Sequence, residues 1–190
     1  MNETQAIQTA HEIITLYQLY GNEDYIGEPV SQIEHMCQCA QLAEKEKYDD
    51  EVILAAFFHD IGHLCEHIMD VDYMDDYGIF DHEKIGADYL HNKGFSKRIT
   101  KLVESHVAAK RYLTYKSPEY YDKLSEASKK TLNFQGGKMN EVEAKAFERE
   151  EWFSLGLTLR GWDEQAKTEH VPLPDLGHFC NLMIQHLIKN

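Results

Sequence analysis

Basic residues and long apolar runs are both scarce in this chain of 190 residues. Lys and Arg number 19 against 33 Asp and Glu, which gives a formal net charge of −14 at pH 7. A surface this acidic repels phosphate backbones and anionic lipids. No apolar run approaches the ~20 residues that a membrane-spanning helix requires. These shortages argue against nucleic-acid-binding proteins and membrane proteins, and we expect neither kind of partner.

Cysteine and proline are also rare, with four residues of each. The cysteines fall inside helical patterns and lack the spacing of a disulfide framework. They are Cys37, Cys39, Cys65 and Cys180. The first residues of the chain include acidic side chains but no basic segment, so we expect neither a signal peptide nor a transit peptide. We therefore expect a reduced, cytoplasmic protein.

Apolar residues recur at helical spacing along nearly the whole chain. Ile33, Met36, Cys37 and Ala40, for example, follow the i, i+3, i+4, i+7 stripe of an amphipathic helix. We find no strand-like alternation and no internal repeat, and the hydrophobic content of 43% is enough for a core. We predict a single all-α domain, a helical bundle that spans residues 1–190.

Residues typical of helix ends divide the pattern into elements. Pro29 suits the first turn of a helix, Asp81 a helix N-cap and Gly94 the position after a helix end. Ser117 before Pro118 and Asn140 three residues before Glu143 mark two further starts. We expect helices over residues 29–47, 49–64, 81–92, 97–112 and 174–188, and loops over residues 21–28 and 69–80.

His59 and Asp60 follow the most apolar part of the predicted helix 49–64. An unpaired ionised carboxylate in a core costs several kcal/mol, so this pair needs a partner. A metal ion would satisfy both side chains, and the two oxygens of one carboxylate can bridge two ions. Taken alone, however, the pair is explained better by an aspartate at a helix end that pairs with a nearby lysine.

A wider set of histidines and aspartates changes this interpretation. The chain has eleven histidines, an unusually high number, and several follow the predicted helices in order. Four imidazoles and two carboxylates suit two cations of the manganese, iron and zinc range, whereas calcium and magnesium prefer oxygen ligands. Helical bundles build dinuclear sites from such inward-pointing residues. The candidate ligands are His35, His59, Asp60, His82, His106 and Asp163.

The order H…HD…H…H…D resembles the HD-domain superfamily of helical metalloproteins. The segments around these residues resemble more closely the mixed-valent diiron oxygenases that degrade phosphonates, relatives of myo-inositol oxygenase. They are DYIGE (24–28), QIEH (32–35), HDIGH (59–63), HEKIGADYL (82–90), HVAAKRYL (106–113), LSEASKKTLNFQGG (124–137) and GWDE (161–164). The resemblance covers nearly the whole chain in the same order.

The resemblance implies two iron ions, Fe(II) and Fe(III), with O2 as the co-substrate. It implies that His35, His59, Asp60 and Asp163 hold one iron and that His82 and His106 hold the second. Asp60 would bridge the two ions. Without the metals, the carboxylates of this pocket would repel an anionic phosphonate.

The resemblance also implies how the substrate is held. His63, Lys110, Ser128, Thr131 and Gln135 would grip the phosphonate oxygens. Spacing alone places His63 on the face of His59 and Lys110 on that of His106, four residues apart in each case. For the stripe of Ser128, Thr131 and Gln135, spacing alone is explained better by a solvated helix face.

Two residues of the loop 21–28 complete the predicted site. The resemblance implies that Tyr25 occupies an iron position until substrate arrives and then swings away. Glu28 would move with it and approach the ammonium group of the substrate. Tyr25, Glu28 and Asp60 are therefore the predicted catalytic residues, and Glu28 is also a predicted substrate contact.

The implied reaction is oxidative cleavage of the carbon–phosphorus bond of 2-amino-1-hydroxyethylphosphonate to glycine and phosphate. A 2-oxoglutarate-dependent hydroxylase would supply this substrate. Two alternatives stay open: a metal-dependent phosphohydrolase with the same ligands, and the same oxidation of an N-methylated or trimethylammonio substrate to glycine betaine and phosphate. A quaternary ammonium would need an aromatic or acidic cage. The residues expected for that cage are Tyr20, Tyr25, Glu28, Met36 and Cys37.

Overall fold

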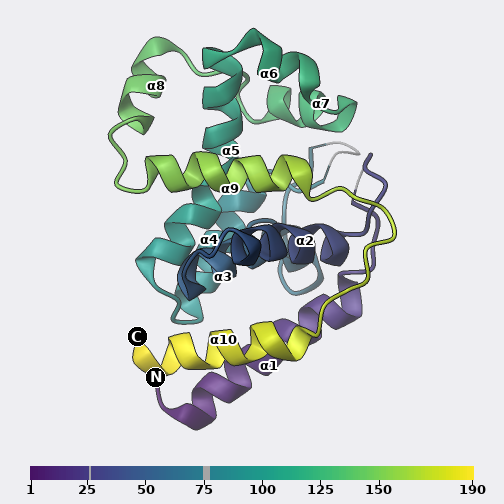
Figure 1. The fold of residues 1–190 in the computed structure, drawn as a ribbon, viewed down its shortest axis with the longest axis vertical. Helices are drawn as coiled ribbons and strands as arrows, with labels where there is room; N and C mark the ends of the chain where they lie inside the picture. Colours follow the sequence, from purple (N-terminus) through teal and green to yellow (C-terminus); the bar gives the residue numbers. More distant parts are fainter. Residues whose placement is uncertain (26, 75–77) are drawn as a thin grey trace.

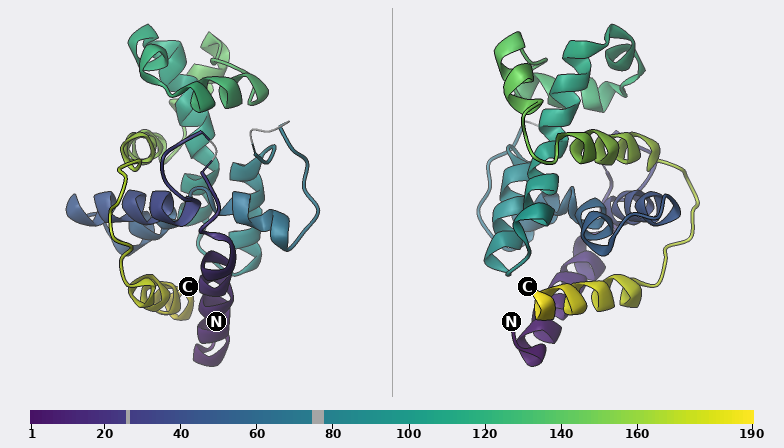
Figure 2. Two further views of the ribbon diagram at one scale, coloured as in Figure 1. Left: turned by 90° about the vertical axis from the view of Figure 1, so that its right-hand side faces the viewer. Right: turned by 60° about the vertical axis from the view of Figure 1, so that its left-hand side comes forward.

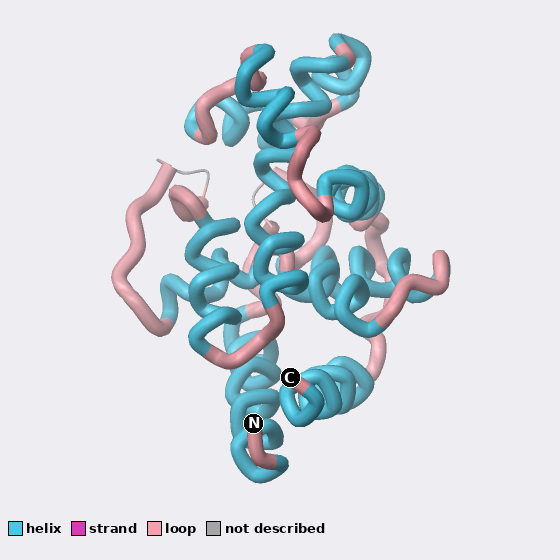
Figure 3. Tube along the Cα trace, turned by 90° about the vertical axis from the view of Figure 1, so that its left-hand side faces the viewer, coloured by secondary structure: helices cyan, strands magenta, loops and turns pink. Residues whose placement is uncertain are grey.

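The computed structural model describes residues 1–25, 27–74 and 78–190. Within these ranges the regular structure is helical, apart from two isolated β-bridges (Figure 3). The predicted all-α class is therefore confirmed. Ile26 of the first predicted loop and residues 75–77 of the second lie outside the described residues. The elements are α1 (Glu3–Tyr20), α2 (Gln32–Lys45), α3 (Asp50–Phe58), the 3₁₀ helix η1 (Ile61–His67), α4 (His82–Asn92), α5 (Lys97–Lys116), α6 (Pro118–Lys123), α7 (Glu126–Phe134), α8 (Glu141–Phe147), α9 (Phe153–Gln165) and α10 (Leu176–Lys189).

The helices are arranged around α3 and α5 (Figure 1). Helices α1 and α10 lie side by side at one end of the molecule. Helix α10 packs against α3, and α1 packs against η1. Helix α5 packs on α3, α4 and α9 and then extends to the opposite end, where α6, α7 and α8 gather (Figure 2). None of the described helices is both long and apolar enough to cross a membrane.

Several predicted helix ends are confirmed by their caps. Ser117 accepts a hydrogen bond from the Tyr120 amide and precedes Pro118 at the first position of α6. Asn140 and Glu143 form the predicted capping box of α8. Gly94 follows the end of α4 with a φ of +92°, a conformation that glycine adopts without strain.

Other predicted boundaries are wrong. Pro29 does not lie in the first turn of α2, because Ser31 caps that helix and α2 begins only at Gln32. Asp81 does occupy the N-cap position of α4, but its side chain makes no capping hydrogen bond and its φ is +54°. Helix α5 extends one turn beyond the predicted end, to Lys116.

The largest correction concerns the predicted helix 49–64. Helix α3 ends at Phe58, and a tighter 3₁₀ helix begins at Ile61 after a turn at His59 and Asp60. A Cβ atom at Gly62 would lie 1.9 Å from the carbonyl oxygen of His82, so only glycine lets η1 approach the start of α4 this closely. The change of helix type brings the backbone of η1 against α4.

The core fixes the end of α3 from all sides. Every residue from 52 to 58 is buried, as the apolar run predicts. The Phe57 ring stacks between Tyr17 of α1 and Phe179 of α10, with centroid distances of 4.4 and 4.3 Å. The Tyr17 hydroxyl also donates a hydrogen bond of 2.6 Å to the Phe57 carbonyl. This packing holds the turn at His59 and Asp60 in place.

Candidate metal centre

The turn after α3 directs the adjacent side chains of His59 and Asp60 to the same buried region. His59 ends the α-helical geometry and Asp60 has φ −108° and ψ 13°, so the chain leaves the helix between them. In a continuous helix the two side chains would diverge by about 100°. Here the His59 Nε2 atom lies 3.4 Å from Asp60 Oδ2, and both residues are buried.

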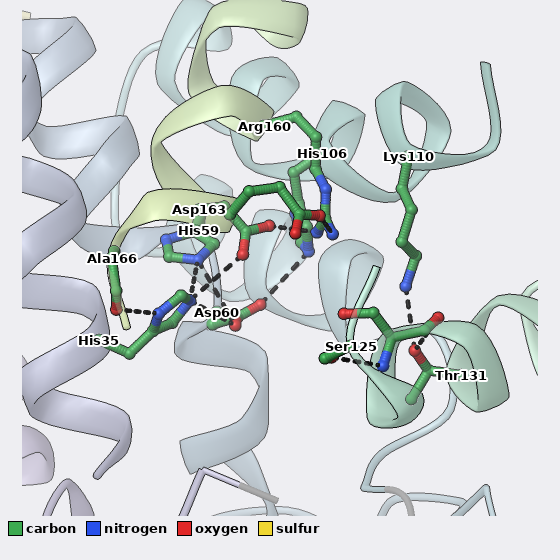
Figure 4. Close-up of polar contacts among 12 residues, drawn as sticks. His35, His59, Asp60, His106, Lys110, Ser125, Thr131, Arg160, Asp163 and Ala166 are labelled. Atoms are coloured by element: carbon green, nitrogen blue, oxygen red, sulfur yellow. Dashed lines mark hydrogen bonds and ion pairs between the residues drawn. The ribbon is translucent and has the colours of Figure 1, made fainter. Parts of the chain in front are cut away.

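His35, His59 and Asp163 form the first group of candidate ligands, which we call site A (Figure 4). They come from α2, the end of α3 and α9. The Nε2 atoms of His35 and His59 are 3.0 Å apart, and His35 Nε2 lies 3.4 Å from Asp163 Oδ1. All three side chains are buried.

Asp60, His82 and His106 form the second group, which we call site B. The Nε2 atoms of His82, at the start of α4, and His106, on α5, are 3.0 Å apart. Asp60 Oδ1 lies 3.4 and 3.3 Å from them. Its other oxygen, Oδ2, faces the histidines of site A at 3.5 and 3.4 Å. The carboxylate of Asp60 therefore lies between the two sites, one oxygen toward each.

The hydrogen bonds of the four histidines show which ring nitrogens are free. The Nδ1 atoms of His35, His59 and His106 lie 2.9, 2.8 and 2.7 Å from main-chain carbonyl oxygens, to which only an N–H can donate. His82 Nδ1 faces a carbonyl more distantly, at 3.4 Å. In the neutral rings Nε2 then carries a lone pair, as in histidines that bind metals.

The positions of the ring nitrogens show whether these residues fit metal ions. In each site two Nε2 atoms face one another at 3.0 Å, so the two rings need either a proton or a metal ion between them. The Oδ1 atom of Asp163 is buried and has no hydrogen-bond partner. Buried polar atoms are rarely left unpaired. The donors therefore fit two ions of the manganese, iron and zinc range, as the sequence predicts.

The charges of the metal-free centre are balanced by protons. Burial disfavours the charged form of His59, but the nearby Asp60 carboxylate outweighs it and raises the pKa of His59 well above its usual value. Burial likewise opposes ionisation of Asp60, and the charge of His59 still holds its pKa well below the usual range. A metal ion would take over the role of these protons.

A cavity of about 60 Å³ opens onto both sites. It is small but has room for more than one water molecule. The residues that the resemblance implies for binding of the aminophosphonate all line it, as do four of the candidate ligands, Asp60, His82, His106 and Asp163. Its walls are Tyr25, Glu28, Gln32, Asp60, His63, Met74, His82, His106, Lys110, Ala127, Ser128, Thr131, Gln135, Arg160 and Asp163.

Lys110 and His63 are each close to one histidine of site B. Lys110 follows His106 by one turn of α5, and His63 lies next to His82. Burial, with the charge of Arg160, lowers the pKa of Lys110 to about 7, and its Nζ donates a 3.0 Å hydrogen bond to Thr131. The His63 ring stacks on His82 at 4.1 Å. Burial, with the charge of His82, lowers the pKa of His63 to about 3, so this ring is neutral. Ser128, Thr131 and Gln135 line the cavity, and each of them is half-buried.

Tyr25 covers site A. Its ring stacks on His35 with a centroid distance of 4.2 Å. Burial, with the charge of Asp60, raises the pKa of its hydroxyl well above the usual value. Gly27, two residues on, has a φ of +76°, and a Cβ there would lie 2.7 Å from Ala127 of α7. The Tyr25 loop is therefore pressed against α7, over the cavity.

Tyr25→Phe should leave the fold and metal content unchanged but alter the iron environment of the resting protein. The ring still stacks on His35, whereas the hydroxyl that approaches Asp60 is lost. Mössbauer spectra of the iron-loaded protein without substrate measure this change. Identical spectra of Tyr25→Phe and the unaltered protein would contradict a role of the Tyr25 hydroxyl at the resting centre.

Sequence reasoning missed one charged residue of the cavity wall. Arg160 of α9 is 4% exposed, pairs with Asp163 and Glu164, and donates a 3.0 Å hydrogen bond to the Tyr120 hydroxyl. Because of Arg160, the pKa of Asp163 stays well below its usual value although burial opposes this. The spacing Arg160, Asp163, Glu164 (i, i+3, i+4) was the available signal.

The cage expected for a quaternary ammonium does not form. Tyr20 stacks on His67 at 3.8 Å, and Met36 and Cys37 pack in the main hydrophobic core. Of the expected cage residues only Tyr25 and Glu28 line the cavity. The expectation for Tyr20, Met36 and Cys37 was wrong, because helical spacing places α2 residues on faces but does not say which face meets a cavity.

Taken together, the fold and the two buried groups of histidine and aspartate define a helical protein with two candidate metal sites side by side. The model of the HD domain matches residues 33–134, a range that holds five of the six candidate ligands and ends before Asp163. The chain therefore belongs to the HD-domain family.

Three relatives resemble the chain over most of its length. An uncharacterized protein of Acanthamoeba polyphaga mimivirus is 46% identical over 189 residues, which covers 100% of this chain and 86% of the relative. The [1-hydroxy-2-(trimethylamino)ethyl]phosphonate dioxygenase (glycine-betaine-forming) of Leisingera caerulea is 40% identical, with 88% and 84% covered. The hydroxymethylphosphonate dioxygenase of Gimesia maris is 36% identical, with 88% and 82% covered. The predicted resemblance to oxygenases that act on phosphonates is confirmed, because two of these relatives are named phosphonate dioxygenases.

Proposed function

We propose that the protein is a diiron dioxygenase that cleaves the carbon–phosphorus bond of a short 1-hydroxyphosphonate. The position of the Asp60 carboxylate, with one oxygen toward each histidine pair, supports this most directly. Two of the similar proteins are named as phosphonate dioxygenases. Iron is the proposed metal, because imidazole and carboxylate suit it and because it reacts with O2.

The proposed reaction balances without an external reductant. The C–P bond of R–CH(OH)–PO3 breaks, C1 becomes the carboxyl group of R–COOH, and phosphorus leaves as phosphate. The substrate gives up four electrons, and O2 accepts them and contributes two oxygen atoms to the products. For 2-amino-1-hydroxyethylphosphonate the products are glycine and phosphate. An enzyme that hydroxylates the parent phosphonate, such as a 2-oxoglutarate-dependent hydroxylase, would supply the substrate.

The side chains of the cavity have separable tasks in this proposal. A bound iron pair would supply the redox chemistry. Lys110, Ser128, Thr131 and Gln135 line the same cavity as Asp60, supply hydrogen-bond donors and would orient the phosphonate. Tyr25 covers the centre until the substrate enters, which would keep oxygen away from an empty site.

Oxygen dependence tests the proposal against the alternative of an HD phosphohydrolase. Iron-loaded protein is given hydroxyphosphonates with and without O2, and phosphate release and oxygen uptake are measured together. We expect one O2 consumed per phosphate and no release without oxygen. Equal release of phosphate under anaerobic conditions would identify the protein as a hydrolase.

Lys110→Ala should raise KM for the phosphonate by about 10- to 100-fold, the effect of one hydrogen bond to a charged group. In the unaltered protein kcat/KM should fall above about pH 7, because the ammonium form of Lys110 is lost there. Lys110→Arg, which stays charged, should move this fall to higher pH, and the ionisation of the substrate is the same in both. Lys129→Ala, which removes a lysine paired with exposed Glu126, is the control. An unchanged pH profile of Lys110→Arg would contradict this role.

A further inference from the structure

Glu28, the residue expected to meet the substrate's ammonium, already has a cationic partner in the protein. Its Oε1 atom accepts hydrogen bonds from Lys167 Nζ at 2.7 Å and from the Ser125 hydroxyl at 2.6 Å. The side chains of Glu28 and Lys167 are only 8% and 14% exposed. Glu28 lines the cavity, whereas Lys167 lies behind it. The pair is formed within the chain, and no substrate group is needed to neutralise Glu28.

The position of Lys167 is fixed on both sides. The carbonyl of the preceding residue, Ala166, accepts the hydrogen bond from His35 Nδ1 at 2.9 Å. The main chain of the following residue, Thr168, exchanges two hydrogen bonds with the Gln38 side chain, at 2.9 and 3.0 Å. The segment after α9 is thereby tied to α2. Lys167 cannot leave Glu28 by a simple movement of its backbone.

Ser125 is similarly held. While its hydroxyl donates to Glu28, the same oxygen accepts a 3.1 Å hydrogen bond from the Ser128 amide, as the N-cap of α7. Glu28 is therefore bound to two separate elements, the start of α7 and the segment after α9. Both contacts end on Oε1, so they fix the carboxylate in place and set a cation, Lys167, directly beside it.

The charges of the cavity also disfavour a cationic substituent. Lys110 and Arg160 both line its wall, and Lys167 stands behind Glu28. An ammonium group at Glu28 would either displace Lys167 from the carboxylate or lie next to Lys167. In both cases two cations share the single negative charge of Glu28. A trimethylammonium group does not find the expected cage, because only Tyr25 and Glu28 of the expected cage residues line the cavity.

We infer that Lys167 is a specificity-determining residue, which directs the reaction toward 1-hydroxyphosphonates whose C1 substituent carries no cation. This inference rests on the proposed function. Hydroxymethylphosphonate is the smallest such substrate, and its oxidation with one O2 would give formate and phosphate. Lys167 acts by holding the charge of Glu28, not by contact with the substrate.

The test compares kcat/KM for three substrates in the iron-loaded protein and in Lys167→Met. The substrates are hydroxymethylphosphonate, 2-amino-1-hydroxyethylphosphonate and its trimethylammonio analogue, and both oxygen uptake and phosphate are measured. We expect the unaltered protein to prefer hydroxymethylphosphonate. Lys167→Met should shift the preference by about tenfold or more toward the primary amine, because Glu28 becomes free to pair with it. The shift should lie in KM for the amine.

Two further variants separate specificity from general damage. Lys167→Arg retains the cation and should keep the original preference. Lys129→Met removes a half-buried lysine of α7 that pairs with exposed Glu126, and it should leave the preference unchanged. The inference is overturned if the unaltered protein prefers the amine, or if Lys167→Met turns over the substrates with an unshifted ratio; in both cases the proposed function survives. If none of the three consumes oxygen, the proposed function falls together with the inference.

Discussion

Asp60→Ala should lose both metal ions. One Asp60 oxygen faces the histidines of site A and the other faces those of site B, so this substitution removes a ligand from both sites. A Lewis-acid ion contributes several kcal/mol to the stabilisation of a transition state, so turnover should fall by about 10³-fold or more. Metal content per chain, measured by elemental analysis after purification, checks the prediction directly.

Asp163→Ala provides the matched comparison. Asp163 belongs to site A alone, so this variant should lose the ion of site A and retain the ion of site B. Far-UV circular dichroism shows whether each variant still folds. Retention of two ions per chain by Asp60→Ala would show that its carboxylate does not bridge, and equal losses in both variants would show that the sites fill only together.

Removal of the two metals should lower the melting temperature by about 15–30 °C. Each ion present at 1,000 times its Kd stabilises the folded state by about 4 kcal/mol, so two ions contribute about 8 kcal/mol, and each kcal/mol corresponds to about 2–4 °C for a chain of this size. Calorimetry of the iron-loaded protein before and after dialysis against a chelator measures the difference. Addition of Fe(II) without oxygen should restore the higher melting temperature.

This difference should grow as the pH rises above about 6.5, the pKa of an unperturbed histidine. In the metal-free protein, burial opposes protonation of His35 and His59, yet Asp163 and Asp60 raise their pKa values. Stability from a raised pKa is present at low pH and is lost as pH rises through it. The metal-free protein therefore loses stability with pH, while the ions compete with fewer protons and bind more tightly. Asp60→Ala should show no effect of the chelator, and a chelator effect of the same size in that variant would contradict binding at these sites.

The gathering of the candidate ligands could be predicted from the sequence, because it depends on signals that are local. His59 and Asp60 are adjacent, and an apolar run before them predicts a buried position. His82 and His106 fall at recognisable helix positions, and the structure brings all six candidate ligands together. Their binding of metal stays a prediction. The helix caps at Ser117 and Asn140 were predictable for the same reason, since a cap is a contact between near neighbours.

The features that could not be predicted depend on tertiary contacts. The end of α3 is hidden, because the residues of η1 continue the apolar pattern and only the close packing of Gly62 on α4 requires a tighter helix. Likewise nothing near Lys167 in the sequence indicates Glu28, from which it is separated by most of the chain. Arg160 was missed for a similar reason. Its spacing to Asp163 and Glu164 can be read from the sequence, but its burial beside the cavity cannot.

The contact between Gly62 and His82 is one of main chain with main chain. Peptide groups cannot rotate out of the way as side chains do, so the span from the turn at His59 and Asp60 to His82 is set by covalent geometry and hard-sphere contact. In a bound centre, ionic radius would then be a selection criterion in its own right. A wide ion such as calcium, whose oxygen ligands lie 2.3–2.6 Å away, would be disfavoured by the rigidity of the frame as well as by the chemistry of imidazole.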